Sequence, residues 1–224
     1  PYYLDKARSG YKNGNGQLID GLTKDGLIDV YHNYPMGNAA ELCATECNIS
    51  REDQDEFAIE SYKRSAAAWE AGKFKDEIIP ITIPQRKAED LIFARDEHPR
   101  LSSIEKLSSL RAAFRNGGTV TAGNSSGVND GAAALLIVSE DALKKYNLEP
   151  IAEVVSSAAA GVPPEIMGIG PVPATQKALK RAGIGVKDLD LIELNEAFAA
   201  QAIACIRDLD LNPALNIDAV IFTG

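Results

Sequence analysis

A helix with one apolar face is the clearest pattern in the first half of the chain. The apolar residues at helical spacing are Ile59, Tyr62, Ala66 and Trp69. Ser50 to Asp53 resembles a capping box with Asp in the place of Glu, and Gly72 is suited to end the helix. The pattern therefore predicts a helix that starts after Ser50 and stops before Gly72.

The rest of the first 118 residues is more polar and irregular. Residues 1–33 are punctuated by glycines and read as loop with short elements. Short helices are expected at 38–47 and at about 104–111. Residues 77–84, EIIPITIP, are expected to be extended, and their prolines favour a sheet edge over a central strand.

From Thr119 onward, apolar runs alternate with helical patterns. Strands are expected at the start of 119–148, in its apolar run, at 151–161 and in DLIELN. Helices are expected just before Leu148 and at 174–183. This alternation predicts an α/β layered fold from which the first 118 residues form a mainly helical excursion.

Composition narrows the possible functions. The chain has 224 residues, of which 45% are hydrophobic, so a substantial core is feasible. Its net charge of -9 argues against nucleic-acid binding, and no apolar run reaches the length of a membrane span. Two histidines are too few and too scattered to suggest a metal site. The three cysteines, which form no C-x-x-C pair, suit a reducing compartment such as the cytoplasm.

The junction at Asn195 and Glu196 has two interpretations. Asn195 is suited to cap a helix, and Glu196 in a first helical turn would be favoured by the helix dipole. Alternatively, the junction lies at the carboxyl end of a strand, where α/β proteins tend to bind ligands. The alanine-rich helix that follows could be buried between layers, which would make a polar tip costly unless it serves a function.

Four stretches in order are similar to signatures of the thiolase family. They are PMGNAAE leading into ISREDQDEFAIES, TAGNSSGVNDGAAALLIVSE, GIGPVPATQKALKRAG and NEAFAAQ. The resemblance covers about residues 1–208 and points to acetyl-CoA C-acetyltransferases. It implies an incomplete thiolase-like α-β-α-β-α layered fold with an inserted, mainly helical loop domain. Residues 1–118 would be this coenzyme A-binding loop domain, 119–150 the end of the N-terminal half, and 151–224 the start of the C-terminal half.

The resemblance also implies a chemistry. Thiolases condense two acetyl-CoA molecules or cleave 3-ketoacyl-CoA through a cysteine thioester, with oxyanion holes that stabilise the charged states. Coenzyme A and acetyl-CoA would be substrates, and no permanent cofactor is expected. The parent protein would be a homo-oligomer, a dimer or a tetramer, in the cytoplasm or another reducing compartment.

Site residues follow from the same resemblance. Asn195 would hold the water of an oxyanion hole, and Ser126 would hydrogen-bond the pantetheine arm, along which Ala122 would lie. Four further residues would contact the nucleotide end or the acyl group: Phe114 and Arg86 for the former, Met167 and Phe198 for the latter. Without the resemblance, Ser126 is an ordinary turn serine, Arg86 a solvated arginine, and Met167 and Phe198 core residues.

Several departures from the family qualify these expectations. None of the cysteines lies in the Cys-Gly-Ser-Gly setting of the nucleophile, the second catalytic Cys is absent, and His98-Pro99 lacks the glycine of Gly-His-Pro. Pro35 stands where many short-chain members have His, which leaves the acyl length open. We therefore expect a chain cut from the middle of a thiolase, with no turnover by itself. The alternative is a non-catalytic module that binds an acyl-CoA or a partner; a purely structural role has little support.

Overall fold

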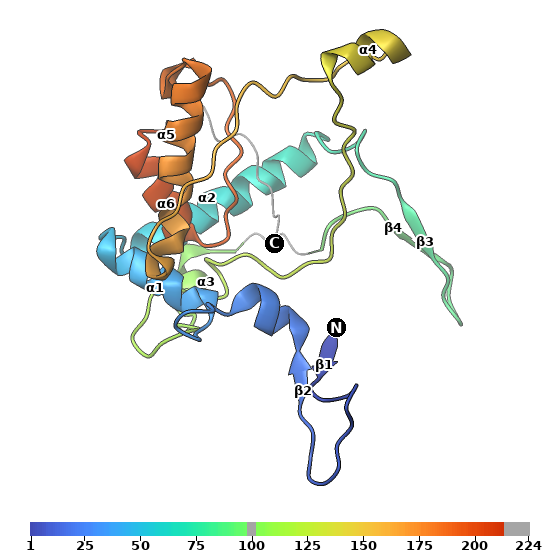
Figure 1. Ribbon diagram of the computed structural model, residues 1–224, viewed down its shortest axis with the longest axis vertical. Coiled ribbons are helices and arrows are strands. Elements are labelled where there is room, and N and C mark those ends of the chain that lie inside the picture. The colour runs from blue at the N-terminus through green and yellow to red at the C-terminus, as the bar shows by residue number, and fades with distance from the viewer. Residues whose placement is uncertain (98–101, 213–224) are drawn as a thin grey trace.

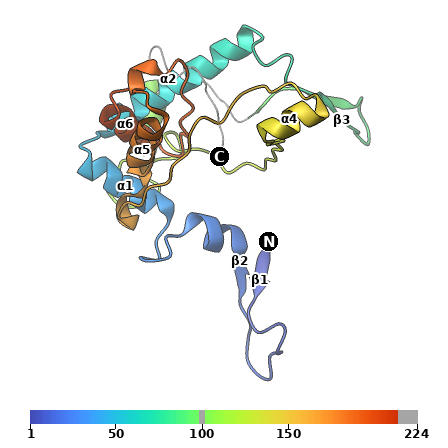
Figure 2. The same cartoon turned by 45° about the horizontal axis from the view of Figure 1, so that its top comes forward.

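The computed structural model describes residues 1–97 and 102–212, and His98 and most of the tail lie outside them. Helices α1, α2, α3, α5 and α6 gather on one side of the molecule, α4 lies apart from them, and two β-hairpins project (Figure 1). After a 45° turn, the β1–β2 hairpin still points away from the group of α1, α2, α5 and α6 (Figure 2).

The first two helices confirm the expected pattern. Helix α1 spans Met36–Glu46 and α2 spans Arg51–Glu70. The Ser50 side chain caps α2 by accepting a hydrogen bond from the Asp53 N–H, and the Asp53 carboxylate accepts one from the Ser50 N–H, so the capping box is present.

The remaining helices are shorter. Helix α3 covers Ile104–Ser108, α4 covers Glu140–Tyr146, α5 covers Pro171–Ala182 and α6 covers Ala199–Asp208. A π-helical turn, η1, lies at Thr23–Leu27, and 3₁₀ turns lie at Pro164–Ile169 (η2) and Val186–Asp188 (η3). Gly183 ends α5 in the left-handed conformation, as its sequence predicts.

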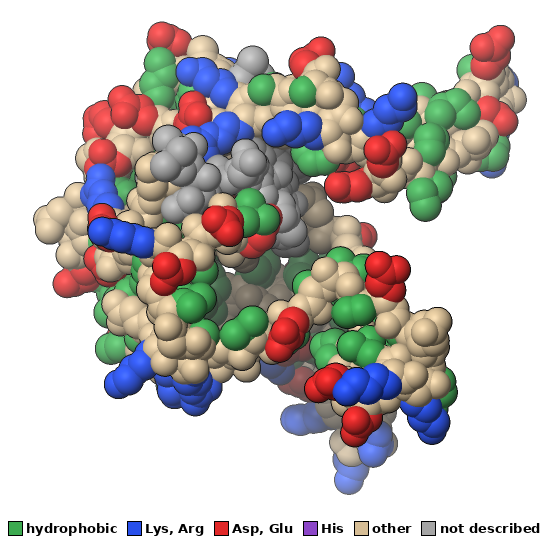
Figure 3. All heavy atoms as spheres, turned by 90° about the horizontal axis from the view of Figure 1, so that it is seen from above, with side chains coloured by type: hydrophobic (Ala, Val, Ile, Leu, Met, Phe, Trp, Pro, Cys, Tyr) green, Lys and Arg blue, Asp and Glu red, His purple; other side chains and the backbone are tan. Residues whose placement is uncertain are grey.

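The strands form two separate antiparallel hairpins. Strand β1 (Tyr2–Leu4) pairs with β2 (Leu18–Asp20), and β3 (Ile81–Ile83) pairs with β4 (Leu91–Phe93). The extended edge segment expected at 77–84 is thus confirmed as part of a two-stranded sheet. Hydrophobic side chains lie exposed along the projecting β3–β4 hairpin (Figure 3).

The strands expected after Thr119 are wrong for this chain. Among the described residues, the runs at 119–138, 151–161 and 189–195 contain no β-strand. Val120 is buried, but most of the large apolar side chains that follow are open to solvent: Leu135 is 89% exposed and Val154 is 75% exposed. A strand needs a ladder partner for its backbone groups, and among the described residues these runs find only the isolated bridge between Ser125 and Phe198.

The start of α6 also differs from expectation. The helix begins at Ala199 with Phe198 at its N-cap, so Asn195 does not cap it and Glu196 does not lie in its first turn. The antiparallel bridge between Phe198 and Ser125 keeps this part of the chain extended and delays the helix. The predicted burial of the alanine-rich helix is confirmed, because every residue from Ala199 to Ile206 is buried.

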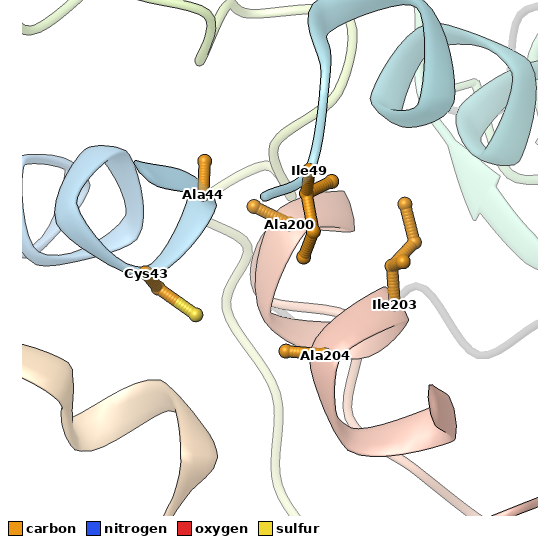
Figure 4. Close-up of a cluster of buried hydrophobic side chains, with 6 residues drawn as sticks. All are labelled: Cys43, Ala44, Ile49, Ala200, Ile203 and Ala204. Atoms are coloured by element: carbon orange, nitrogen blue, oxygen red, sulfur yellow. The ribbon is translucent and has the colours of Figure 1, made fainter. Parts of the chain in front are cut away.

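One of the buried hydrophobic clusters forms where α1 meets α6. Cys43 and Ala44 of α1 lie against Ala200 and Ala204 of α6, and Ile49 and Ile203 complete the cluster (Figure 4). Small side chains allow the two helices to approach closely. Because α6 is held here, the turn that precedes it is fixed relative to α1.

A polar contact joins the segment before α1 to the second half of the chain. His32 Nδ1 lies 2.9 Å from Asp29 Oδ1, and its Nε2 lies 3.3 Å from Glu165 Oε1 in η2. Among the described residues, no group of three or more His, Cys, Asp or Glu is arranged to hold a metal ion. The structure also contains no helix, within its described part, that is long and apolar enough to cross a membrane.

Gly37 allows the closest approach between α1 and the loop after α3. A Cβ at Gly37 would fall on the ring of Phe114. We expect Gly37→Ala to lower the free energy of unfolding by about 1–3 kcal/mol, because overpacking outweighs the better helix propensity of alanine. Gly26→Ala is the control, since its Cβ would meet nothing within 4 Å. Urea unfolding of both variants checks this, and equal stabilities would contradict the contact.

Candidate active site

The buried face of α2 is polar. Its buried residues include Gln54, Asp55, Ser61 and Ser65. Of the apolar residues expected to form the buried face, Ile59 is buried, whereas Trp69 is only half-buried. A polar face needs hydrogen-bond partners, and α2 finds them in two loops far away in the sequence.

Asp55 anchors the first of these loops. Its Oδ1 accepts a hydrogen bond of 2.9 Å from Asn124 Nδ2, while its Oδ2 pairs with Arg51 Nε at 2.7 Å. Asn124 Oδ1 accepts the Thr121 N–H at 2.8 Å, and its Nδ2 also donates to the Thr119 carbonyl at 3.1 Å. Both polar atoms of the buried Asn124 side chain are thus satisfied, which fixes the fold of the loop.

A buried carboxylate from α1 holds the start of the same segment. Glu41 accepts the N–H groups of Thr119 and Val120, each at 2.9 Å. Arg115 Nε lies 3.4 Å from the Glu41 carboxylate and partly balances its charge. The backbone of residues 119–124 is therefore tied to both α1 and α2.

The second loop is the turn before α6, and it pairs directly with the first. The Ser126 N–H donates to the Ala197 carbonyl at 3.0 Å, and the Ala199 N–H donates to the Asn124 carbonyl at 3.0 Å. Between these bonds lies the bridge from Ser125 to Phe198. This short antiparallel pairing places Ser126 beside the Asn195–Phe198 turn, two regions that the sequence separates by about 70 residues.

A small pocket opens where the two loops meet α2. Ala58, Ser61 and Tyr62 line it from α2, and residues 123–126 and Glu196 line it from the loops. Ser61 Oγ donates a hydrogen bond of 2.9 Å to Glu196 Oε2. Burial raises the pKa of Glu196 to about 7, against the opposing effects of the Ser61 hydrogen bond and the charge of Arg64. A carboxyl that titrates near neutrality in a pocket is a common feature of functional sites.

The structure brings three of the predicted site residues close together. Ser126 lines the pocket, Phe198 is paired with the Ser126 loop, and the ring of Phe114 contacts that of Phe198 edge to face, with 6.2 Å between centroids. Asn195 directly precedes Glu196 and is exposed. Its oxyanion role stays a prediction, as do the coenzyme A roles of Ser126, Phe114 and Phe198.

The other predicted residues lie farther from the pocket. Ala122 is exposed in the first loop, and Met167 is exposed in η2. Arg86 is exposed in the connection between β3 and β4, on the hairpin that projects from the helices (Figure 1). None of the three lines the pocket, and their proposed contacts with coenzyme A or an acyl group stay predictions.

The two buried cysteines, Cys43 and Cys205, are poor nucleophiles in this arrangement. Burial raises the pKa of Cys43 to about 12, and burial also raises the pKa of Cys205. Cys205 Sγ donates to the Gly168 carbonyl at 3.4 Å. Because the thiolate is the reactive form, neither buried thiol is set up for acyl transfer at neutral pH.

Sequence reasoning missed Ser61, Tyr62, Asp55 and Asn124 as parts of the site. Ser61 and Asp55 lie in a charged helix, where a polar residue is ordinarily solvated. A weak signal was present: the helical pattern of α2 contains few large apolar residues for its length of 20 residues, so its buried face had to include polar ones.

Comparison with known proteins places this geometry in a class. Residues 1–141 match the model of the thiolase N-terminal domain, and residues 148–219 match that of the thiolase C-terminal domain. The chain belongs to the thiolase family. The division into a loop domain and two half-domains stays a prediction.

Individual relatives agree with this assignment. The acetyl-CoA acetyltransferase of Escherichia coli is 53% identical over 211 residues, which is 93% of this chain and 53% of the relative. That of Chromobacterium violaceum is 50% identical over 210 residues, or 93% of this chain and 54% of the relative. The chain thus spans about half the length of the curated relatives that it matches.

Solved structures confirm the thiolase-like α/β fold. The Bacillus anthracis acetyl-CoA acetyltransferase superposes with a TM-score of 0.85 at 44% identity, covering 96% of this chain and 55% of that one. Human mitochondrial 3-ketoacyl-CoA thiolase in complex with CoA gives 0.85 at 44% identity, covering 98% of this chain and 55% of that one. The expected fold class is confirmed, although the strands expected after Thr119 do not form among residues 119–212.

Replacing Asn124 tests the anchor. Asn124→Asp would place a second carboxylate against Asp55, and we expect it to lower the free energy of unfolding at pH 7 by about 3–5 kcal/mol. One carboxyl of such a pair has a raised pKa when folded, so the protein recovers stability as the pH falls and loses it as the pH rises through that value. Asn129→Asp, at an exposed position of the same loop, is the control. Fluorescence of the single tryptophan, Trp69, during urea unfolding measures both; equal losses would contradict the anchor.

Proposed function

We propose that this chain forms the acyl-CoA-binding part of a thiolase-type acyltransferase. The complete protein would transfer an acetyl group between two coenzyme A thioesters, or cleave a 3-ketoacyl-CoA by thiolysis. One observation carries the proposal: the backbone pairing of residues 124–126 with residues 197–199. It joins the loop that contains Ser126 to the turn that contains Asn195. The Ser126 hydroxyl and the Asn195 amide would therefore act on the same bound thioester.

The two loops would have different tasks. The Ser126 hydroxyl would hydrogen-bond the pantetheine arm, since its backbone N–H is already engaged by Ala197. The Asn195 amide would orient a water toward the thioester oxygen, where negative charge develops. An amide suits this task because it presents a dipole without a net charge that would need pairing. The acyl-accepting cysteine would come from outside these 224 residues.

Compartment and assembly are part of the same proposal. The three cysteines are free, which suits the cytoplasm or another reducing compartment. A role in lipid metabolism follows from the proposed acyl-CoA substrates. Exposed apolar residues on the β1–β2 hairpin, such as Tyr2 and Leu18, would be covered in a homo-oligomer of the complete protein. Coenzyme A and acetyl-CoA would act as substrates, with no permanent cofactor.

Coenzyme A binding tests the loop assignment. We expect calorimetry to detect binding of coenzyme A to the chain, and Ser126→Ala to weaken it about threefold to tenfold, the effect of one lost hydrogen bond. Ser109→Ala should leave the affinity unchanged, since that hydroxyl donates to the Lys106 carbonyl away from the pocket. Undetectable heat with the folded chain would overturn the assignment, and so would equal affinities of the two variants.

The buried thiols lead to a second expectation. The purified chain alone should not cleave acetoacetyl-CoA in the presence of coenzyme A, because Cys43 and Cys205 stay protonated at neutral pH. Loss of acetoacetyl-CoA absorbance measures the reaction, with a full-length acetyl-CoA acetyltransferase as the positive control. Turnover that survives further purification and scales with the chain's concentration would refute this expectation.

A further inference from the structure

Glu196 occupies the point where three parts of the molecule meet. It follows Asn195, and its carboxyl group lies in the pocket between α2 and the loop at 123–126. Ser61 of α2 donates to it at 2.9 Å. No role assigned above to binding or to the oxyanion uses this carboxyl group.

The surroundings of the carboxyl group favour its neutral form. From the loop it faces the neutral side chains of Asn124, Ser125 and Ser126. From α2 it faces Ala58, the Ser61 hydroxyl and Tyr62, whose own pKa is raised by burial and by the nearby charge of Glu196. Arg64, one turn further along α2, attracts the ionised form, but burial is the larger effect, and the pKa of Glu196 lies at about 7.

The carboxyl group is also mechanically connected to the binding loop. The next residue, Ala197, accepts the Ser126 N–H at 3.0 Å, and Ala199 donates to the Asn124 carbonyl at 3.0 Å. Asn124 is in turn bound to Asp55 of α2 at 2.9 Å. Ser61 and Asp55 therefore hold the turn and the loop, respectively, against the same helix.

We propose that Glu196 is a positioning residue: its neutral carboxyl group, held by Ser61, keeps the turn at 195–198 and the Ser126 loop in the arrangement that binds acyl-CoA. This inference rests on the proposed function, because it concerns the same pocket. Ionisation brings a charge into a pocket that solvates it poorly, so the turn separates from α2 and the Ser126 loop loses its register. The carboxyl group touches no reacting atom in this role.

The sign of the pH effect follows from the direction of the shift. The neutral form is favoured in the assembled pocket, so the stabilisation is complete at pH values below the ordinary pKa of a glutamate. It is lost as the pH rises through about 7. Affinity for coenzyme A should fall over the same interval.

Glu196→Gln isolates the effect in a binding experiment. Glutamine keeps an oxygen that accepts from Ser61 but carries no ionisable group. Calorimetry with coenzyme A should give similar affinities for the wild type and the variant at pH 6. At pH 8.5 the wild type should bind at least about fivefold more weakly than the variant. Because the phosphates of coenzyme A titrate near pH 6 themselves, the ratio between the two proteins is the quantity compared. Glu193→Gln, at an exposed position of the same segment, should follow the wild type.

A second measurement needs neither ligand nor variant. In NMR spectra of the wild-type chain, the Glu196 side-chain carboxyl and the amide groups of Ser126 and Ala197 should titrate together with a midpoint near pH 7. If calorimetry detects no binding at either pH but this joint titration is present, the proposed function fails and the positioning role stands. If Glu196 titrates without Ser126 and Ala197, or the affinity ratio is the same at both pH values, the positioning role is overturned.

Discussion

The hydrogen bond between the Asp55 carboxylate and the Asn124 amide is the contact on which the site depends. Both side chains are buried, so each would be costly without the other. The bond fixes the loop after Thr119 against α2, and only a loop held in this way can pair its backbone with the turn before α6. The pocket, and the positions of Ser126 and Glu196 in its lining, depend on that pairing.

The rest of the scaffold serves to hold these loops in place. Alanines on α6 let it approach α1 closely, so the turn that leads into α6 has a rigid base. Glu41 reaches from α1 to the backbone of Thr119 and Val120. Polar contacts of this kind are directional, unlike apolar packing, and they specify one arrangement of the loops among several of similar compactness.

Helices and strands differ in how far the sequence alone predicts them, because they depend on partners at different distances along the chain. Helices were well predicted because their hydrogen bonds and caps are local, as the capping box at Ser50 illustrates. Strands after Thr119 were predicted from apolar runs, yet no strand forms there and most of the large apolar side chains are exposed, with Leu135 at 89% exposure. A ladder requires a second segment, and the described residues supply these runs with no more than the isolated bridge between Ser125 and Phe198. The chain itself spans about half the length of its relatives. The roles of Ser61 and Asp55 could not be predicted for the same reason, because each depends on a partner far away in the sequence.

By itself, the sequence determined the family, the positions of the main helices, the burial of α6 and the set of motifs that contain Ser126, Asn195 and Phe198. Only the tertiary structure decided that α2 buries a polar face, that α6 starts at Ala199, and that Glu196 lies in a pocket beside Ser61. Local patterns report interactions between neighbours in the chain, whereas the pocket is made by residues up to 135 positions apart, whose contact depends on how the helices pack.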